Sequence, residues 1–211
     1  MRTKTLLAAA AILAAGLASS LAQSNVYSLN VVGYANVSLP AGFTIIGNPL
    51  QGTNNGINTV LPNVPLGTLL YKYNNGFGSP AEFAGVGVGW DVNQTLAPGE
   101  GAFIQVPSAT TVTFVGEVIQ GNTTNSMPSG FSLRASKVPQ QAGLTSVLGF
   151  PAVAGDLIYF FNKNTQSYTG GIYESAGGNL WDPSEPAPEV GQGFWVQKAA
   201  AADWVRNFTV Q

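Results

Sequence analysis

The catalytic chemistry open to this sequence rests on carboxylates, because the chain contains no His and no Cys. That absence excludes Ser-His-Asp and Cys-His catalysis, and zinc or copper held by imidazole or thiolate. Glycoside hydrolysis needs two carboxyl groups about 5–9 Å apart. The candidate acids are Glu82, Asp91, Glu100, Glu174, Asp182, Glu185 and Glu189. The segment 185–189 reads more simply as a solvated acidic loop, so we predict a non-enzymatic protein, with a glycoside hydrolase as the less favoured alternative.

Two Trp-Asp pairs, Trp90-Asp91 and Trp181-Asp182, occupy matching places in the Gly- and Pro-rich loops 77–98 and 169–190. A Trp ring exposed beside polar groups binds sugar rings, and a Trp folded back over its own small core is the simpler alternative. Each Asp suits a turn cap. A hard cation needs at least five converging oxygens, and no Asp-x-Asp-x-Asp run supplies them. These four residues are therefore weak ligand-binding candidates, and we predict no catalytic residue, metal or cofactor.

The chain contains most of its motifs twice. Residues 40–45, Pro-Ala-Gly-Phe-Thr-Ile, match residues 128–133, Pro-Ser-Gly-Phe-Ser-Leu, and residues 67–73 match 155–161 at the same offset of 88. The Gly-x-Gly motif at 99–101 returns at 191–193, an offset of 92. Four residues are therefore inserted in the loops of the second copy, where length changes are tolerated. The period is too long for a solenoid or propeller, whose repeats run to roughly 20–50 residues.

We predict an all-β fold with two tandem pseudo-repeated domains of small sandwich or barrel type, at residues 23–118 and 119–211. Apolar pairs at helical spacing predict one short helical turn in each domain, at 57–61 and 144–148. Each Gly-x-Gly turn leads into an apolar strand, 101–106 or 193–198. The aromatic at the shared position of each strand, Phe103 or Trp195, is predicted to be buried in the core of its own copy.

Residues 26–39 alternate apolar and polar side chains and predict an entering strand. The counterpart before the second copy is predicted at 112–122, so that the strand closing the first copy also enters the second. The strand at 26–39 either pairs within its own chain or joins a neighbouring subunit by strand addition. Internal pairing is favoured, because short connections favour neighbouring partners.

The order of motifs is Pro-x-Gly-Phe-x-Leu/Ile, Gly-x-x-x-Tyr, a loop Trp, and Pro-Gly-x-Gly-x-Phe/Trp-Val. It resembles a largely uncharacterised family of secreted bacterial β-repeat modules, which usually read Gly-Trp-Asn-Leu-Ile-Ser early and Pro-Gly-x-Gly-Tyr-Trp-Val late. Residues 191–196, Gly-Gln-Gly-Phe-Trp-Val, match the late pattern better than residues 98–103 do. The resemblance covers nearly the whole mature chain and implies a secreted β module. It carries over no catalytic residue.

The first 22 residues read as a secretory signal peptide, with basic residues at 2 and 4, an apolar run at 6–17 and Ser20-Leu21-Ala22 before the cleavage site. Cleavage leaves 211 − 22 = 189 residues, with six basic and ten acidic side chains. No basic patch is available for nucleic acid, and no later apolar run is long enough to span a membrane.

We therefore predict a protein that is secreted to the periplasm or the extracellular space. Its expected role is a structural or adhesive component of the bacterial cell envelope or extracellular matrix. The alternative is a carbohydrate-binding module that uses the loop Trp residues. The expected partners are further copies of the chain or a cell-surface polysaccharide.

Export has a direct test. Because signal peptidase cuts after the small residue at −1, the exported protein should begin at Gln23. N-terminal peptide mapping of material collected outside the cytoplasm checks this. Residues 1–22 retained on that material would instead show an uncleaved anchor.

Overall fold

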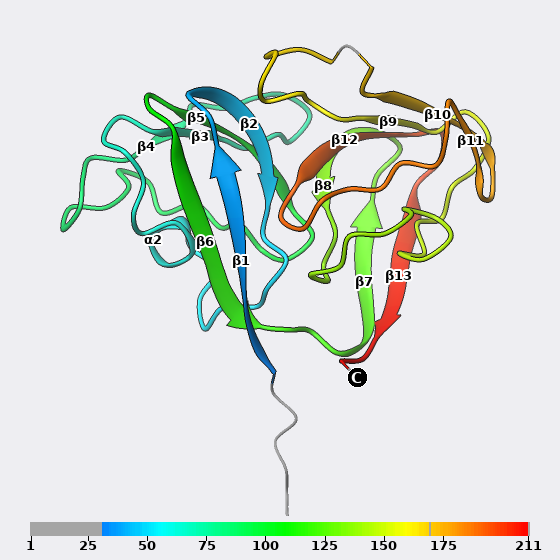
Figure 1. Cartoon of the computed structure of the whole chain (residues 1–211), viewed down its shortest axis with the longest axis horizontal. Helices are drawn as coiled ribbons and strands as arrows, with labels where there is room; N and C mark the ends of the chain where they lie inside the picture. The colour runs from blue at the N-terminus through cyan, green and yellow to red at the C-terminus, as the bar shows by residue number, and fades with distance from the viewer. Residues whose placement is uncertain (1–30, 169, 211) are drawn as a thin grey trace, which may run out of the picture. The chain divides into compact units, whose positions relative to one another are not determined.

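The computed structural model describes residues 31–168 and 170–210, so the predicted signal peptide and residues 26–30 of the entering strand lie outside it. Nearly all regular structure in the described part is antiparallel β (Figure 1). The predicted all-β fold is confirmed. We refer below to residues 31–118 as half one and to residues 119–210 as half two.

Half one packs a two-stranded ribbon on a four-stranded sheet. The ribbon pairs β1 (Val32–Leu39) with β6 (Thr110–Glu117). The sheet has the order β2-β5-β3-β4, formed by β2 (Gly42–Gly47), β5 (Gly101–Val106), β3 (Leu69–Tyr71) and β4 (Ala81–Glu82). Side chains alternate between core and solvent along β1 and β6, as half-buried strands require. Ribbon and sheet enclose one apolar core between them.

Half two repeats this pairing. Its ribbon joins β7 (Gly121–Met127) to β13 (Ala202–Phe208). Its sheet has the order β11-β10-β9-β12-β8, formed by β11 (Leu180–Asp182), β10 (Ile172–Gly177), β9 (Leu157–Tyr159), β12 (Gly193–Lys198) and β8 (Gly130–Ala135). The longer β10–β11 hairpin lies where the sequence places its insertion. The two strand orders agree with a duplication, which stays an interpretation, and both halves lie in one compact unit.

Two predictions about secondary structure need correction. The only α-helix of the described residues is α2 (Ile57–Val60) in half one. At 144–148 the chain forms a turn, closed by hydrogen bonds from the N–H groups of Val147 and Leu148 to the Gly143 carbonyl. The strand closing half one also does not enter half two. Residues 110–117 pair with β1, and a separate strand, 121–127, pairs with β13.

The entering strand pairs internally along its described length. Residues 32–39 are in register with residues 117–110, from Val32 opposite Glu117 to Leu39 opposite Thr110. This pairing agrees with the favoured alternative for residues 32–39, because the strand that could have been exchanged already has a partner in its own chain.

The Gly-x-Gly motifs lie where the two halves meet. The Gly47 N–H donates to the Gly191 carbonyl at 2.9 Å, and the Ala135 N–H donates to the Gly99 carbonyl at 3.0 Å. The two donors, Gly47 and Ala135, are 88 residues apart, and the two acceptors, Gly99 and Gly191, are 92 apart. The two hydrogen bonds therefore occupy equivalent places in the two halves. A Cβ on Gly193 would lie 2.5 Å from the Ile46 carbonyl oxygen, and one on Gly101 would lie 2.9 Å from the Arg134 nitrogen. Glycine is required at 101 and 193 because backbone packs against backbone.

Phe103 and Trp195 do not line the cores, contrary to the prediction. Their neighbours Ile104 and Phe194 are fully buried there, and side chains alternate along a strand. Phe103 and Trp195 are half-buried on the opposite face of their sheets, with ring centroids 6.4 Å apart. The rings of this face join the halves through further edge or tilted contacts of Phe43, Tyr71, Tyr73, Phe77, Phe131, Tyr159, Phe161 and Tyr168.

The close approach of Gly193 to the Ile46 backbone predicts that the stability of the fold depends on glycine at this position. Gly193→Ala should destabilise the fold by about 1–3 kcal/mol, since the new methyl group meets backbone atoms that cannot rotate away. The measurement is the free energy of unfolding from chemical denaturation. Gly78→Ala is the matched control, because a Cβ at 78 enters open space. It should change stability by less than about 1 kcal/mol. Equal losses at both positions would contradict the close-approach explanation.

Candidate functional site

The two loop tryptophans differ in burial, and Trp90 does not form a sugar platform. Trp90 is 5 % exposed and its indole N–H donates to the Leu61 carbonyl at 3.0 Å. Trp181 is half-buried, donates to the Thr145 hydroxyl at 2.9 Å and packs on the Phe150 ring at a centroid distance of 6.2 Å. The burial of Trp90 removes the open ring face that stacking on a sugar requires, so Trp90 acts as a lid on its own core.

The two aspartates beside them differ. Asp91 accepts from the N–H groups of Glu82 and Val92, both at 2.7 Å, which is the predicted turn cap. Asp182 is exposed at the end of the outer strand β11, opposite Glu174. The structure therefore does not bring Asp91 and Asp182 together into one site: one caps a turn in half one, the other lies on the edge of half two.

Several of the remaining acids hold local structure. Glu100 pairs with the Lys72 ammonium at 2.7 Å and accepts from the Ala97 N–H at 2.9 Å. Glu185 accepts from the N–H groups of Thr145 and Ser146, both at 2.6 Å, and from the Ser146 hydroxyl at 2.7 Å. Glu185 therefore fixes the 144–148 turn, and the interpretation of 185–189 as a merely solvated loop is wrong at this residue. In the described part of the chain no three acidic side chains gather into a metal site.

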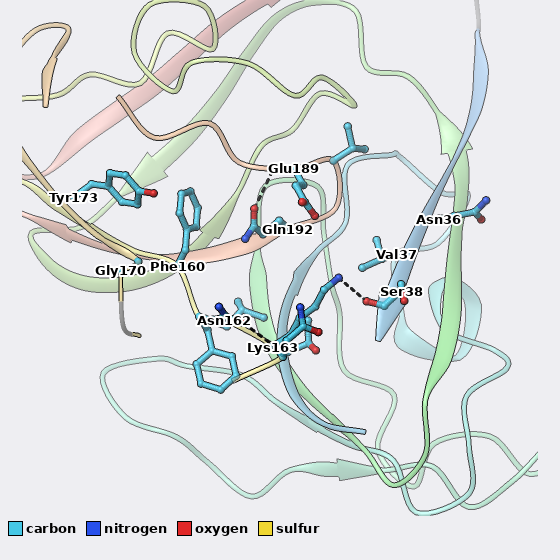
Figure 2. Close-up of a pocket in the computed structure, with 16 residues that line it drawn as sticks. Asn36, Val37, Ser38, Phe160, Asn162, Lys163, Gly170, Tyr173, Glu189 and Gln192 are labelled. Carbon is cyan, nitrogen blue, oxygen red and sulfur yellow. Dashed lines mark hydrogen bonds between the residues drawn. The ribbon is translucent and has the colours of Figure 1, made fainter. Parts of the chain in front are cut away.

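An open cleft of about 460 Å³ lies between the two halves (Figure 2). One wall is the edge of half one, formed by β1 and β2 at residues 36–38 and 44–45. The other wall is half two, where residues 160–164 and 170–173 form the hairpin between β9 and β10, and the loop 189–192 leads to β12. Figure 2 shows Lys163 reaching across toward Ser38, Phe160 and Tyr173 to the left of the view, and Asn36 pointing away.

The hairpin is attached to half one by side chains. The Val118 N–H donates to the Val31 carbonyl, and in this register the odd-numbered residues of β1 form the backbone hydrogen bonds with β6. The N–H and C=O groups of the even-numbered residues therefore point to the other side of β1, the edge that no strand covers. There the Lys163 ammonium donates to the Ser38 carbonyl at 2.8 Å. Gln166 accepts from the Phe43 N–H at 2.8 Å and donates to the Phe43 carbonyl at 2.9 Å. The amide of Gln166 thus occupies the edge of β2 as a strand would.

A buried hydroxyl without a partner lines the cleft. Thr44 is 5 % exposed, and its Oγ1 makes no hydrogen bond within the described part. Leaving such a group unpaired destabilises a fold by about 1–3 kcal/mol, and unpaired buried groups often mark a site that a ligand or water completes. The residue at the matching position of half two, Ser132, also has a buried, unpaired hydroxyl, but it does not line this cleft.

Hydrogen-bonded side chains cross the matching corner of half two. Asn125, at the position of Val37, donates to the Gly99 carbonyl at 3.0 Å, and Lys137 donates to the Thr124 carbonyl at 2.5 Å. The two halves therefore carry different side chains at equivalent positions of this corner.

The polar lining of the cleft is rich in amides and nearly balanced in charge. It presents Asn162, Asn164 and Gln192 beside the half-buried rings of Phe160 and Tyr173, whose centroids are 5.5 Å apart. Lys163 is the one cation and Glu189 the one carboxylate among the described lining residues. A single carboxylate cannot supply the acid–base pair of a glycosidase. The arrangement suits binding of a neutral polar molecule with an apolar face.

Sequence reasoning missed this cleft. Its residues come from five separate segments, and the offset of 88 pairs Thr44 with Ser132 without showing which of them lines a cleft. The one usable signal was the Asn-Lys-Asn turn at 162–164, where the first copy has a different turn.

Comparison with protein-family models, with curated proteins and with solved structures gave no match. The resemblance to secreted bacterial β-repeat modules therefore stays a prediction. No helix among the described residues has the length and apolar character needed to cross a membrane.

The Glu185 contacts predict a pH-dependent stability. Burial alone would raise the pKa of Glu185, but the hydrogen bonds from Ser146 and Thr145 outweigh it and the pKa lies below its ordinary value. A depressed pKa means that the carboxylate stabilises the fold above its unfolded-state pKa, and that this contribution is lost as the pH falls through the folded-state pKa.

Glu185→Gln should therefore lower the free energy of unfolding by about 1–3 kcal/mol at pH 7, and the gap to the unmutated protein should narrow below about pH 4. Denaturation curves at pH 3 to 7 measure both quantities. Glu174→Gln, at an exposed strand position, is the control and should change stability by less than about 0.5 kcal/mol. A difference in unfolding free energy that does not change with pH would contradict the stabilising role of the Glu185 carboxylate.

Proposed function

We propose that this protein is an exported, non-enzymatic adhesive component of the cell envelope or extracellular matrix that binds a neutral polysaccharide in the cleft between its halves. The observation that carries the proposal is Thr44, whose hydroxyl is buried and unpaired and which helps to line a cleft that also presents amides and two aromatic rings. A saccharide unit would give that hydroxyl a partner and place the apolar face of its ring against Phe160 and Tyr173.

The charge of the cleft favours a neutral ligand. Among the described residues that line it, the one ammonium group, on Lys163, already bonds to the Ser38 carbonyl, and the one carboxylate, on Glu189, would repel an acidic sugar. A volume of about 460 Å³ is that of a small-molecule site rather than a groove for an extended protein partner. Lys163 also covers the end of the β1 edge, so strand addition at Ser38 is not favoured.

Binding can be measured by affinity electrophoresis in gels that contain starch, mixed-linkage β-glucan or xylan, with alginate as the anionic comparison. Retardation is expected in at least one neutral gel and not in alginate. Thr44→Val keeps the shape of the side chain and removes the hydroxyl, so it should weaken binding by about three- to tenfold, the value of one hydrogen bond.

The same variant has a second readout. Because Thr44→Val removes an unpaired buried hydroxyl, it should raise the free energy of unfolding of the unliganded protein by about 1 kcal/mol. Ser132→Ala is the matched control, with the same stabilising change at the equivalent position outside the cleft. It should leave polysaccharide binding unchanged. Retardation in no neutral gel, or equal binding by both variants, would overturn the proposed function.

A further inference from the structure

The core of half two contains an ion pair with no access to solvent. The Lys198 ammonium on β12 contacts the Asp156 carboxylate just before β9, and both side chains are fully buried. Lys198 also donates to the Pro151 carbonyl at 2.7 Å and lies 5.2 Å from the centroid of the Phe150 ring. Asp156 accepts from the N–H groups of Ala199 at 2.8 Å and Val153 at 2.9 Å.

Half one closes the same corner without charge. At the matching positions it has Thr68 and Val106, both fully buried, and the Thr68 hydroxyl donates to the Pro65 carbonyl at 2.6 Å. The backbone turn is the same, because Thr68 N–H bonds to Pro65 and Asp156 N–H bonds to Val153, each at 3.1 Å. Removing two charges from water is unfavourable, and the fold does not require it here. The Lys–Asp pair therefore calls for a chemical explanation.

We propose that Lys198 and Asp156 condense into an intramolecular amide, a covalent cross-link that forms without an enzyme. Two conditions for this reaction are met in the structure. The amine and the carboxyl group are held in contact, so folding has already restricted the translational and rotational freedom that the two reacting groups would otherwise lose. The site excludes water, so no solvent molecule competes with the amine for the carboxyl carbon.

The atoms balance without an added reagent. One ammonium proton passes to Oδ2 of Asp156, the Lys198 amine then attacks Cγ of Asp156, and the Nζ–Cγ bond forms. The Ala199 N–H on Oδ1 stabilises the negative charge that develops there. The Cγ–Oδ2 bond then breaks, and Oδ2 leaves as water with two of the three protons that the ammonium carried. Neither residue is oxidised or reduced.

The product would be well accommodated. Its carbonyl oxygen, Oδ1, keeps the hydrogen bond from the Ala199 N–H, and its one remaining N–H keeps the Pro151 carbonyl as acceptor. The Val153 N–H loses Oδ2 but belongs to an exposed turn, where water replaces it. The cross-link would join positions 42 residues apart in a chain that has no Cys to form a disulfide. Closing such a loop restricts the unfolded chain.

Mass spectrometry of denatured protein tests the proposal. The protein should be lighter than its sequence by one water, and the full mass should return in Lys198→Arg. Tryptic digestion locates the change: chain cleavage after Lys198 should be lost, and a branched peptide containing both Lys198 and Asp156 should appear. The peptide map also distinguishes the cross-link from a succinimide, which loses the same water but leaves the chain cleavable after Lys198. Cyclisation of an N-terminal Gln would change the mass of the N-terminal peptide only.

The double variant Asp156→Thr with Lys198→Val introduces the residues of half one and serves as the folding control. It should fold and show no branched peptide, and it should unfold faster in denaturant than the cross-linked protein. Full mass in the unmutated protein, together with cleavage after Lys198, would overturn the proposal whatever the variants do. Because saccharide binding uses the separate cleft, that result would leave the proposed function unaffected.

Discussion

The contact of backbone with backbone between the two halves is the constraint on which the rest of the structure depends. Gly47 bonds to Gly191, and Ala135 bonds to Gly99, so each sheet continues into the loop before the other half's Gly-x-Gly strand. Side chains at 101 and 193 would prevent this approach. The contact covers sheet edges that would otherwise expose unpaired N–H and C=O groups. It also brings the aromatic faces of both sheets together, and Phe103 and Trp195 become part of the junction between halves.

The candidate site follows from a departure from this regular pairing. Both halves place a small hydroxyl residue at one buried strand position, Thr44 or Ser132. In half two the nearby corner is crossed by Asn125 and Lys137. In half one it stays open toward the hairpin that Lys163 and Gln166 hold in place. Two halves with the same strand order can thus differ at equivalent corners, because small differences between equivalent side chains decide how each corner is filled.

The Lys198–Asp156 pair shows the same principle inside a core. Equivalent corners of the two halves use Thr68 with Val106, or Asp156 with Lys198, on the same backbone turn. The corner thus accepts either an uncharged pair or a charged pair, because the surrounding strands and the turn are the same in both halves.

The sequence alone determined the all-β class, the repeated motif order and the exclusion of His- and Cys-based chemistry, because alternation, turn residues and composition are local properties. It also located α2 and the Asp91 cap, where residues close in the chain decide the structure. It could not tell which face of the strand Phe103 and Trp195 occupy, because strands 101–106 and 193–198 carry apolar residues on both faces. The tertiary structure decided the cleft, since Ser38, Thr44, Lys163 and Gln192 meet only once the two halves pack together.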